Sequence, residues 1–315
     1  MNTNHSIPWV EKYRPNQFEN IVLDPLNKQI LTNIIQNSFF PNLLLYGPPG
    51  TGKTTTIINL VNSYQELLNQ KSKELMIHLN ASDERGIDII RNQINQFVNS
   101  KSLFNKGMKF VILDEVDYMT KNAQQALKSL IQNYSSSVRF CLICNYISRI
   151  DEGLQNEFIK LRFNQLPEND IIFFLKQISF KENLLLDDNS MNLLQKYYKS
   201  DIRSMINFMQ SNQCVTNNQF NIIQSDVWEL LFCKIGALLP LTEIELFINN
   251  TSIKYNINKK NLIKDFCNYI IRNKTEVISC DFLNFVENIM HIEDCKQSYF
   301  IKYTILSLFH FIPKL

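Results

Sequence analysis

Short apolar runs that alternate with longer amphipathic segments constrain the fold of this chain more than any other feature. Between Pro41 and Phe163, four or five such runs are separated by stretches with helical spacing of apolar residues. Runs that are apolar on both faces are typical of strands in a parallel sheet that helices cover on both sides. The sequence therefore predicts an α/β core. The expected strands are Leu43 to Tyr46, Met76 to Leu79, Phe110 to Leu113, Val138 to Cys144 and Ile159 to Phe163.

The strand pattern stops after Pro167, and only helical patterns follow. A chain of 315 residues is long enough for two or three domains, each with its own core. We expect an α/β core over 1–164, a small helical domain over 165–220 and a second helical domain over 221–315. The expected helices of the middle domain are Asp170 to Ser179, Asn189 to Tyr198 and Asp201 to Ser211, and the chain ends in the apolar segment Tyr299 to Ile312.

A phosphate-binding loop follows the first expected strand. Gly47 to Thr54 reads GPPGTGKT, which fits G-x-x-x-x-G-K-[ST], and the helical segment Thr55 to Tyr64 comes next. Glycines let the backbone N–H groups point at phosphate oxygens, and the helix N-terminus adds positive potential. We expect Lys53 to reach the β- and γ-phosphates of ATP and the Thr54 hydroxyl to bind Mg²⁺. The alternative, a glycine-rich turn that binds nothing, is disfavoured because the Lys-Thr pair follows the glycines directly.

Polar side chains end two further expected strands. Asp114 and Glu115 follow an apolar strand, where open α/β sheets bind their ligands. Asp114 is expected to hold Mg²⁺, directly or through water, and Glu115 to polarise the attacking water. Asn145 could help to place that water, although a turn-forming asparagine is an equally good interpretation of this residue alone. Asp117 is expected to be a solvated turn residue.

Composition indicates a folded protein whose DNA contacts, if present, are local. A net charge of +2 gives no overall nucleic-acid signature, and 45% of the residues are hydrophobic. Cys141 and Cys144 form a C-x-x-C pair, but a structural zinc site needs four ligands and no second pair is present. We therefore expect a buried strand there and reduced, mostly buried thiols elsewhere. A polar N-terminus and no apolar stretch of ~20 residues predict an intracellular protein.

A series of motifs resembles the small subunits of replication factor C, the sliding-clamp loader. The series comprises Pro8 to Pro15 (PWVEKYRP), the GPPGTGKT loop, Asn80 to Ile87 (NASDERGI), the acidic strand end and Cys144-Asn145-Tyr146. The resemblance covers Pro8 to Gln210 and extends more faintly over the C-terminus. It implies an AAA+ core over 1–164, a three-helix lid over 165–220 and an all-α collar over 221–315 that joins other clamp-loader subunits in a five-membered ring.

The resemblance also implies the activity and its site. The ring would use ATP and Mg²⁺ to open the sliding clamp and load it onto primer-template DNA, without sequence specificity and without a membrane. Asn145 matches the polar residue called sensor 1, and Arg203 matches the lid arginine called sensor 2, which senses the γ-phosphate. Val10, Tyr13 and Arg14 would border the adenine. The expected ATP-binding residues are Val10, Tyr13, Arg14, Gly47, Pro48, Pro49, Gly50, Thr51, Gly52, Lys53, Thr54 and Thr55, and the expected catalytic residues are Lys53, Thr54, Asp114, Glu115, Asn145 and Arg203.

Three basic residues are candidates for DNA contact. Arg85 and Arg91 lie off the apolar stripe of an expected helix and near its start, where phosphate is favoured. Lys128 matches a DNA-facing basic residue of the family. Contacts of this kind bind phosphate without reading sequence. The alternative for each residue is an ordinary solvated charge.

One position departs from the family pattern. Where the family has Ser-Arg-Cys, which supplies an arginine finger to the neighbouring subunit's ATP, this chain has Asn156-Glu157-Phe158. An arginine finger contributes ~10³–10⁵ in rate, and a glutamate would repel the γ-phosphate. Our hypothesis is that the subunit binds ATP but does not activate its neighbour, either at the ring gap or beside an inactive site. Arg149 or Arg162 could substitute, although their spacing argues against it.

Two other functions remain open from the sequence. One is a scaffold subunit that binds ATP without turnover, and the other is a different DNA-directed AAA+ ATPase such as a branch-migration motor. As a loader subunit the chain would be an ATPase that is efficient only within the complex. It would act in the nucleus of a eukaryotic cell, or at a cytoplasmic replication site if it came from a large DNA virus.

Overall fold

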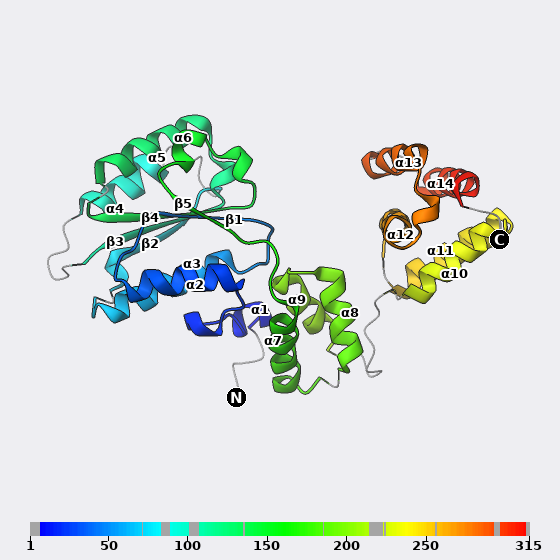
Figure 1. Cartoon of the computed structure of the whole chain (residues 1–315), viewed down its shortest axis with the longest axis horizontal. Coiled ribbons are helices and arrows are strands. Elements are labelled where there is room, and N and C mark those ends of the chain that lie inside the picture. Colours follow the sequence, from blue (N-terminus) through cyan, green and yellow to red (C-terminus); the bar gives the residue numbers. More distant parts are fainter. Residues whose placement is uncertain are drawn as a thin grey trace. The chain divides into compact units, whose positions relative to one another are not determined.

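The chain folds into two compact units, residues Met1–Asn218 and Gln219–Leu315 (Figure 1). The computed structural model describes residues 7–70, 72–82, 89–100, 107–134, 136–184, 186–213, 223, 225–255, 257–292 and 297–312. Each unit has its own apolar core.

The first unit contains the predicted parallel sheet. Its strands pair in the order β2-β3-β4-β1-β5, and every pairing is parallel. The three central strands are buried over nearly their whole length, as the apolar runs predict, whereas the edge strands β2 and β5 are only partly buried. The carboxyl ends of all five strands lie at one edge of the sheet. The strands are β1 (Leu43–Tyr46), β2 (Met76–Asn80), β3 (Lys109–Asp114), β4 (Val138–Cys144) and β5 (Ile159–Arg162).

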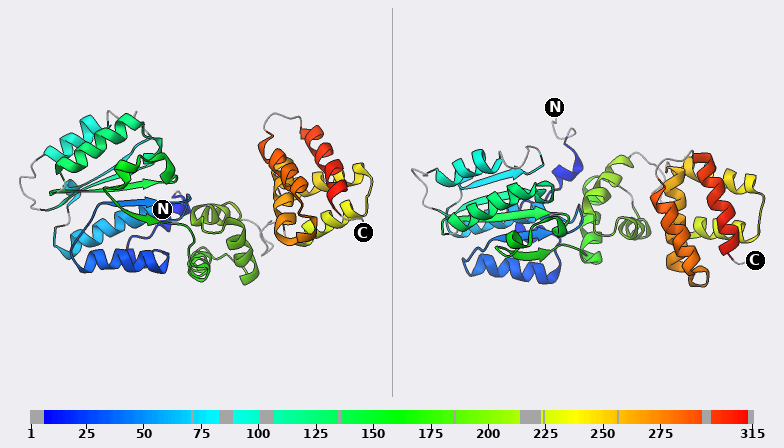
Figure 2. Two further views of the ribbon diagram at one scale, coloured as in Figure 1. Left: turned by 45° about the horizontal axis from the view of Figure 1, so that its top comes forward. Right: turned by 90° about the horizontal axis from the view of Figure 1, so that it is seen from above.

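Helices cover both faces of the sheet (Figures 1 and 2). On one face α2 (Pro25–Gln36) and α3 (Lys53–Leu67) pack against one row of strand side chains, which includes Leu45 and Ile143. On the other face α5 (Lys121–Tyr134) covers the alternate row. Successive strand residues point to opposite faces, so one apolar strand contributes to both cores. Also in this unit are α1 (Trp9–Lys12), α4 (Asn95–Asn99), α6 (Glu152–Gln155), the 3₁₀ turns η2 (Phe18–Asn20), η3 (Lys73–Leu75), η5 (Val116–Tyr118) and η6 (Ile147–Arg149), and the π-helix η4 (Ile89–Ile94).

Three helices complete the first unit and lie beside the phosphate-loop end of the sheet. They match the helices predicted after Pro167, and α8 and α9 begin at aspartates whose side chains accept a backbone N–H of the first turn. The N-terminal helix α1 packs against the third of them. The three helices are α7 (Glu168–Lys181), α8 (Asp188–Tyr198) and α9 (Ile202–Ser211).

The second unit is all-helical where the structure describes it. Apolar residues at helical spacing, such as Phe266 and Ile270, face a shared core with Phe282 and Ile289. Its elements are α10 (Ser225–Gly236), α11 (Leu241–Tyr255), α12 (Lys259–Asn273), the 3₁₀ turn η7 (Thr275–Val277), α13 (Cys280–His291) and α14 (Gln297–Phe311).

The C-x-x-C pair lies in a buried strand, as predicted. Cys141 and Cys144 are buried in β4, and burial raises the pKa of the Cys144 thiol to about 12. No group of His, Cys, Asp and Glu side chains within the described ranges could hold a metal ion by itself. Cys267 is also buried, Cys233 and Cys280 are exposed, and Cys214 and Cys295 lie outside the described residues. None of the helices that the structure describes is long and apolar enough to cross a bilayer.

Candidate nucleotide-binding site

The phosphate-binding loop joins β1 to α3 through glycines in left-handed conformations. Gly50 has φ +74° and approaches α9 so closely that a Cβ atom would lie 1.8 Å from the Asp201 carboxylate. Gly52 has φ +84° and begins α3, and no described atom lies within 4 Å of the place where its Cβ would be. The loop is therefore packed against the protein at Gly50 and open at Gly52, where a phosphate could approach the helix N-terminus.

Lys53 forms hydrogen bonds both to the loop and to the residue that follows β4. Its ammonium donates to the carbonyl oxygens of Gly47 and Pro48, both at 2.8 Å, and to the side-chain oxygen of Asn145 at 3.1 Å. The residue is only 7% exposed. Burial lowers the pKa of Lys53, and the nearby Asp114 carboxylate opposes that shift. All three acceptors are neutral, so a bound phosphate would supply the full negative charge that a buried ammonium favours.

Thr54 and Asp114 meet at the carboxyl end of the sheet. The Thr54 hydroxyl donates to one Asp114 oxygen at 2.6 Å, and the other accepts the Glu115 backbone N–H at 2.8 Å. A hydroxyl and a carboxylate are oxygen ligands of the kind that Mg²⁺ takes together with phosphate and water. The residues present therefore fit a Mg²⁺–nucleotide complex at this point.

The backbone of Glu115 is strained. Its φ of +55° places a non-glycine residue in the left-handed region, which costs on the order of 1 kcal/mol or more. Five other described non-glycine residues share this conformation, so it is the position of Glu115 beside Asp114 that links the strain to the site. The pattern of apolar residues in β3 gives no sign of this conformation, because it depends on the turn η5 that follows.

Asp117 is buried, which corrects the prediction of a solvated turn residue. It is 5% exposed, and one of its oxygens accepts the backbone N–H groups of Asn145 and Tyr146, each at 3.3 Å. The turn after β3 thus holds the turn after β4, and this contact orients Asn145 toward Lys53. Sequence reasoning missed the role because the partners lie on a neighbouring strand, 28 and 29 positions away.

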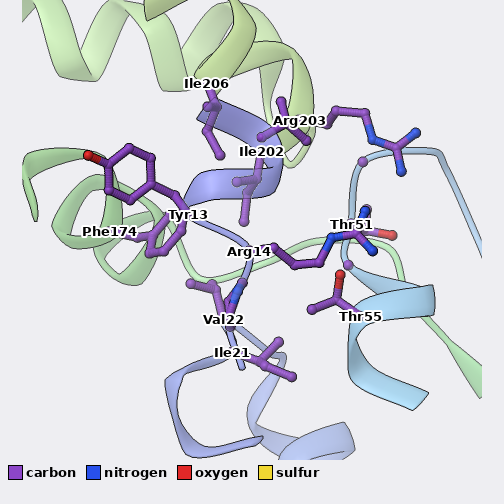
Figure 3. Close-up of a pocket in the computed structure, with 14 residues that line it drawn as sticks. Tyr13, Arg14, Ile21, Val22, Thr51, Thr55, Phe174, Ile202, Arg203 and Ile206 are labelled. Carbon is purple, nitrogen blue, oxygen red and sulfur yellow. The ribbon is translucent and has the colours of Figure 1, made fainter. Parts of the chain in front are cut away.

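An open cavity lies beside the loop (Figure 3). Val10, Tyr13 and Arg14 line it together with loop residues and with Arg203 of α9, so the structure brings these predicted residues together. Pro48 and Pro49 instead line a different cavity, which faces α8 and the start of α9. The lining of the first cavity is Val10, Tyr13, Arg14, Pro15, Ile21, Val22, Gly50, Thr51, Gly52, Thr55, Phe174, Ile202, Arg203 and Ile206.

The candidate DNA-binding residues are only partly described. Arg85 lies outside the described residues, and Arg91 has a described backbone in η4 but no described side chain. Lys128 is half-buried on α5, with its ammonium beside Gly153 of α6. Of these three residues, only Lys128 has a described side chain, so their contact with DNA stays a prediction.

Glu157 occupies the expected arginine-finger position, in the turn between α6 and β5. Its carboxylate accepts from Gln132 of α5 at 2.8 Å. The proposed substitutes lie elsewhere. Arg149 is exposed, with its guanidinium 5.1 Å from the ring centre of Tyr146, and Arg162 is exposed on the edge strand β5.

Comparisons with known proteins place the core of the first unit in a family of ATPases. Residues 43–166 match the family model described as "ATPase family associated with various cellular activities (AAA)". The chain is 41% identical over 246 residues to a probable replication factor C subunit 5 of Dictyostelium discoideum, and the match covers 78% of this chain and 68% of that protein. It is 39% identical over 206 residues to human replication factor C subunit 5, covering 65% and 60%. It is 36% identical over 216 residues to subunit 3 of Saccharomyces cerevisiae, covering 68% and 62%.

A solved structure shows the same fold at low identity. The Holliday junction branch migration motor RuvB of Thermotoga maritima superposes with a TM-score of 0.52 and 15% identity, covering 82% of this chain and 91% of that one. The match to the human and yeast relatives spans about three-fifths of their length. With its identity to the Dictyostelium protein and its AAA core, this chain belongs to the replication factor C subunit family of AAA ATPases.

Proposed function

We propose that the chain is an ATP-binding and ATP-hydrolysing subunit of a sliding-clamp loader. In this role it helps to open the clamp and to load it onto primer-template DNA. Family membership supports the proposal, and the observation that carries it is a pair of contacts. Lys53 donates to Asn145, and Thr54 donates to Asp114, so residues from three separate motifs meet at one end of the sheet.

Each residue at that end has a chemical role in the proposal. Lys53 and the loop N–H groups bind the β- and γ-phosphates, while Thr54 and Asp114 would hold Mg²⁺, which neutralises charge on the phosphates when bound. Glu115 orients and polarises the attacking water, and Asn145 fixes its position. Arg203 contacts the γ-phosphate from α9, so the nucleotide state can change the angle of the helices that carry it.

The other parts of the chain have roles in assembly under this proposal. Helices α7 to α9 (165–220) form the lid, and the helical unit over 221–315 forms the collar that joins other loader subunits in a ring. Arg85, Arg91 and Lys128 bind DNA phosphates without reading sequence. In a eukaryotic cell the complex acts in the nucleus.

Glu157 prevents this subunit from supplying an arginine finger to its neighbour in the ring. A carboxylate cannot offset the charge that develops on a neighbour's γ-phosphate, so the chain does not activate the next site. Its own site needs a finger from another subunit, and hydrolysis by the isolated chain is therefore slow. Fast hydrolysis at the neighbouring site in a ring built with this subunit would contradict the assignment.

Hydrolysis by the reconstituted complex tests the function. We expect clamp plus primed DNA to stimulate ATP hydrolysis, and Glu115→Gln in this subunit to remove its share of that stimulation while ATP binding is kept. Glu74→Gln, which changes an exposed carboxylate in η3, is the matched control and should hydrolyse ATP like the unmodified chain.

The scaffold function predicts a different result. A subunit that only holds the ring together would bind ATP tightly, and its Glu115→Gln variant would leave the stimulated rate of the complex unchanged. The negative charge of Glu157, where the family has a positively charged arginine, is the observation that favours this second function. Hydrolysis that depends on Glu115 would rule it out.

A further inference from the structure

The carboxylate of Glu182 contacts the N-terminal segment beside the nucleotide cavity. Glu182 follows the last turn of α7, and its Oε1 accepts from two consecutive residues of the N-terminal segment. The Lys12 ammonium lies 2.5 Å from this oxygen, and the Tyr13 hydroxyl donates to the same atom. In addition, the backbone N–H of Trp9 donates to Gln210 on α9 at 3.0 Å.

Tyr13 connects this contact to the cavity. Its ring lines the cavity beside Phe174 of α7, and its hydroxyl lies at the end of the ring that points away from Thr51 and Thr55 (Figure 3). Glu182 itself is not part of the cavity lining. One end of the same side chain therefore faces the space next to the phosphate loop, and the other end is held by a residue outside that space.

The chemistry of the contact favours one orientation of the ring. The Glu182 side chain is 17% exposed, and a hydrogen bond from a hydroxyl to a carboxylate is charge-assisted. Burial raises the pKa of Tyr13, and the bond to Glu182 raises it further, so the phenol keeps its proton and donates. The Lys12 and Lys181 ammonium groups lie 5.3 and 5.8 Å from the centre of the ring.

A ring that is held in place before a ligand arrives binds a flat partner at a lower entropic cost than a free ring. The apolar lining formed by Val10, Ile202 and Ile206 suits a purine base, while the glycines of the loop face the phosphates. The base and the phosphates of one nucleotide would thus contact separate parts of the site.

We propose that Glu182 is a positioning residue that sets the affinity for the adenine base by holding Tyr13 beside Phe174. Through the same contact, occupancy of the base site is coupled to α7. The inference rests on the proposed ATP-binding function. It predicts that changes at Glu182 affect binding of the base and leave binding of the phosphates unaltered.

Calorimetric titration with two ligands distinguishes binding of the base from binding of the phosphates. ATP contacts both parts of the site, whereas inorganic tripolyphosphate contacts only the loop. We expect Glu182→Ala to weaken ATP binding by about 3- to 10-fold, the entropic cost of ordering one freed side chain on binding, with tripolyphosphate binding unchanged. Glu182→Gln keeps an accepting oxygen and should recover most of the affinity.

Two further variants assign the effect to Tyr13. Tyr13→Phe keeps the ring and deletes the hydroxyl, so it should weaken ATP binding as Glu182→Ala does, and the double variant should be no weaker than either one. Lys176→Met removes a different ion pair of α7, the one to Asp188, and leaves the tyrosine contact in place. This control should bind ATP with nearly unchanged affinity.

The outcomes distinguish this inference from the proposed function. If the unmodified chain binds ATP and Glu182→Ala binds it equally well, the positioning role is wrong. It is also wrong if Glu182→Ala loses ATP and tripolyphosphate affinity to the same extent, because that result indicates a general structural defect. If the unmodified chain binds neither ligand, the proposed ATP-binding function fails instead.

Discussion

At the residue scale, the carboxylate of Asp117 connects the two strand ends that form the catalytic side of the site. It is a buried residue of η5, and its oxygen accepts from the backbone N–H of Asn145, directly after β4. The neighbouring Glu115 holds a left-handed conformation in the same turn. The position of Asn145 therefore depends on a residue that does not itself contact nucleotide in the proposed mechanism.

Substitution of Asp117 should separate catalysis from binding. Asp117→Ala removes the acceptor of two backbone N–H groups, so we expect the hydrolysis rate in the complex to fall about tenfold or more. The KM for ATP should change little, because Lys53 keeps its bonds to the carbonyl oxygens of Gly47 and Pro48. Asp117→Asn retains one accepting oxygen and should keep most of the rate. Single-turnover hydrolysis at several ATP concentrations measures the rate and the ATP dependence of each variant. Equal rates for Asp117→Ala and Asp117→Asn would contradict the positioning role.

At the element scale, the start of α9 is bonded to the phosphate loop. Asp201 caps the helix by accepting the Ser204 backbone N–H at 3.0 Å, and the adjacent N–H of Ile202 donates to the Gly50 carbonyl at 3.2 Å. Arg203 belongs to the same first turn. We therefore expect a change in the loop on nucleotide binding to shift the start of the helix that carries Arg203.

Two N-cap aspartates allow a matched comparison. Asp187 caps α8 by accepting the Ser190 N–H at 3.0 Å, and α8, unlike α9, contributes no residue to the nucleotide cavity. Asp187→Ala and Asp201→Ala should each cost about 1 kcal/mol of stability, as loss of an N-cap does. Only Asp201→Ala should also weaken ATP binding, because it disturbs Gly50 and Arg203. Thermal melting and ATP titration of both variants check this, and equal ATP affinity in the two would show that the cap does not act on the site.

At the scale of the whole molecule, the two units have separate cores. Every residue of the candidate nucleotide site belongs to Met1–Asn218, and the helices of the second unit share a cluster that includes Phe282. Stability of the second unit and occupancy of the site are therefore expected to be independent in the isolated chain.

A pair of phenylalanines tests this independence. Phe282 in α13 and Phe110 in β3 are both fully buried, and replacing either with alanine should cost about 3–5 kcal/mol. Phe282→Ala should leave ATP affinity unchanged, while Phe110→Ala should lower it because β3 leads into Asp114. Calorimetric unfolding with and without ATP should show that Phe282→Ala affects only the transition that ATP does not shift. Weakened ATP binding in Phe282→Ala would refute the separation.

Much of the first unit could be predicted because its signals are local. The central strands are apolar on both faces and the phosphate loop is a continuous motif, so periodicity and spacing indicate them directly. The buried strand at Cys141 and Cys144 followed from the same pattern, and the structure confirms it. The edge strands β2 and β5 were predicted at the right residues, but their partial exposure was not predicted. Exposure depends on the order of the strands in the sheet, which the sequence of one strand does not indicate.

Lys53, Thr54, Asp114, Glu115 and Asn145 are recognisable as candidate catalytic residues from their neighbours in the chain. The contacts that hold them come from the folded arrangement of the strands. Asp117 is buried because the turns after β3 and β4 lie side by side, and Glu182 reaches Tyr13 across 169 positions because α7 packs beside the N-terminal segment. Such contacts join residues that are distant in sequence, so no local pattern of hydrophobicity or charge contains them.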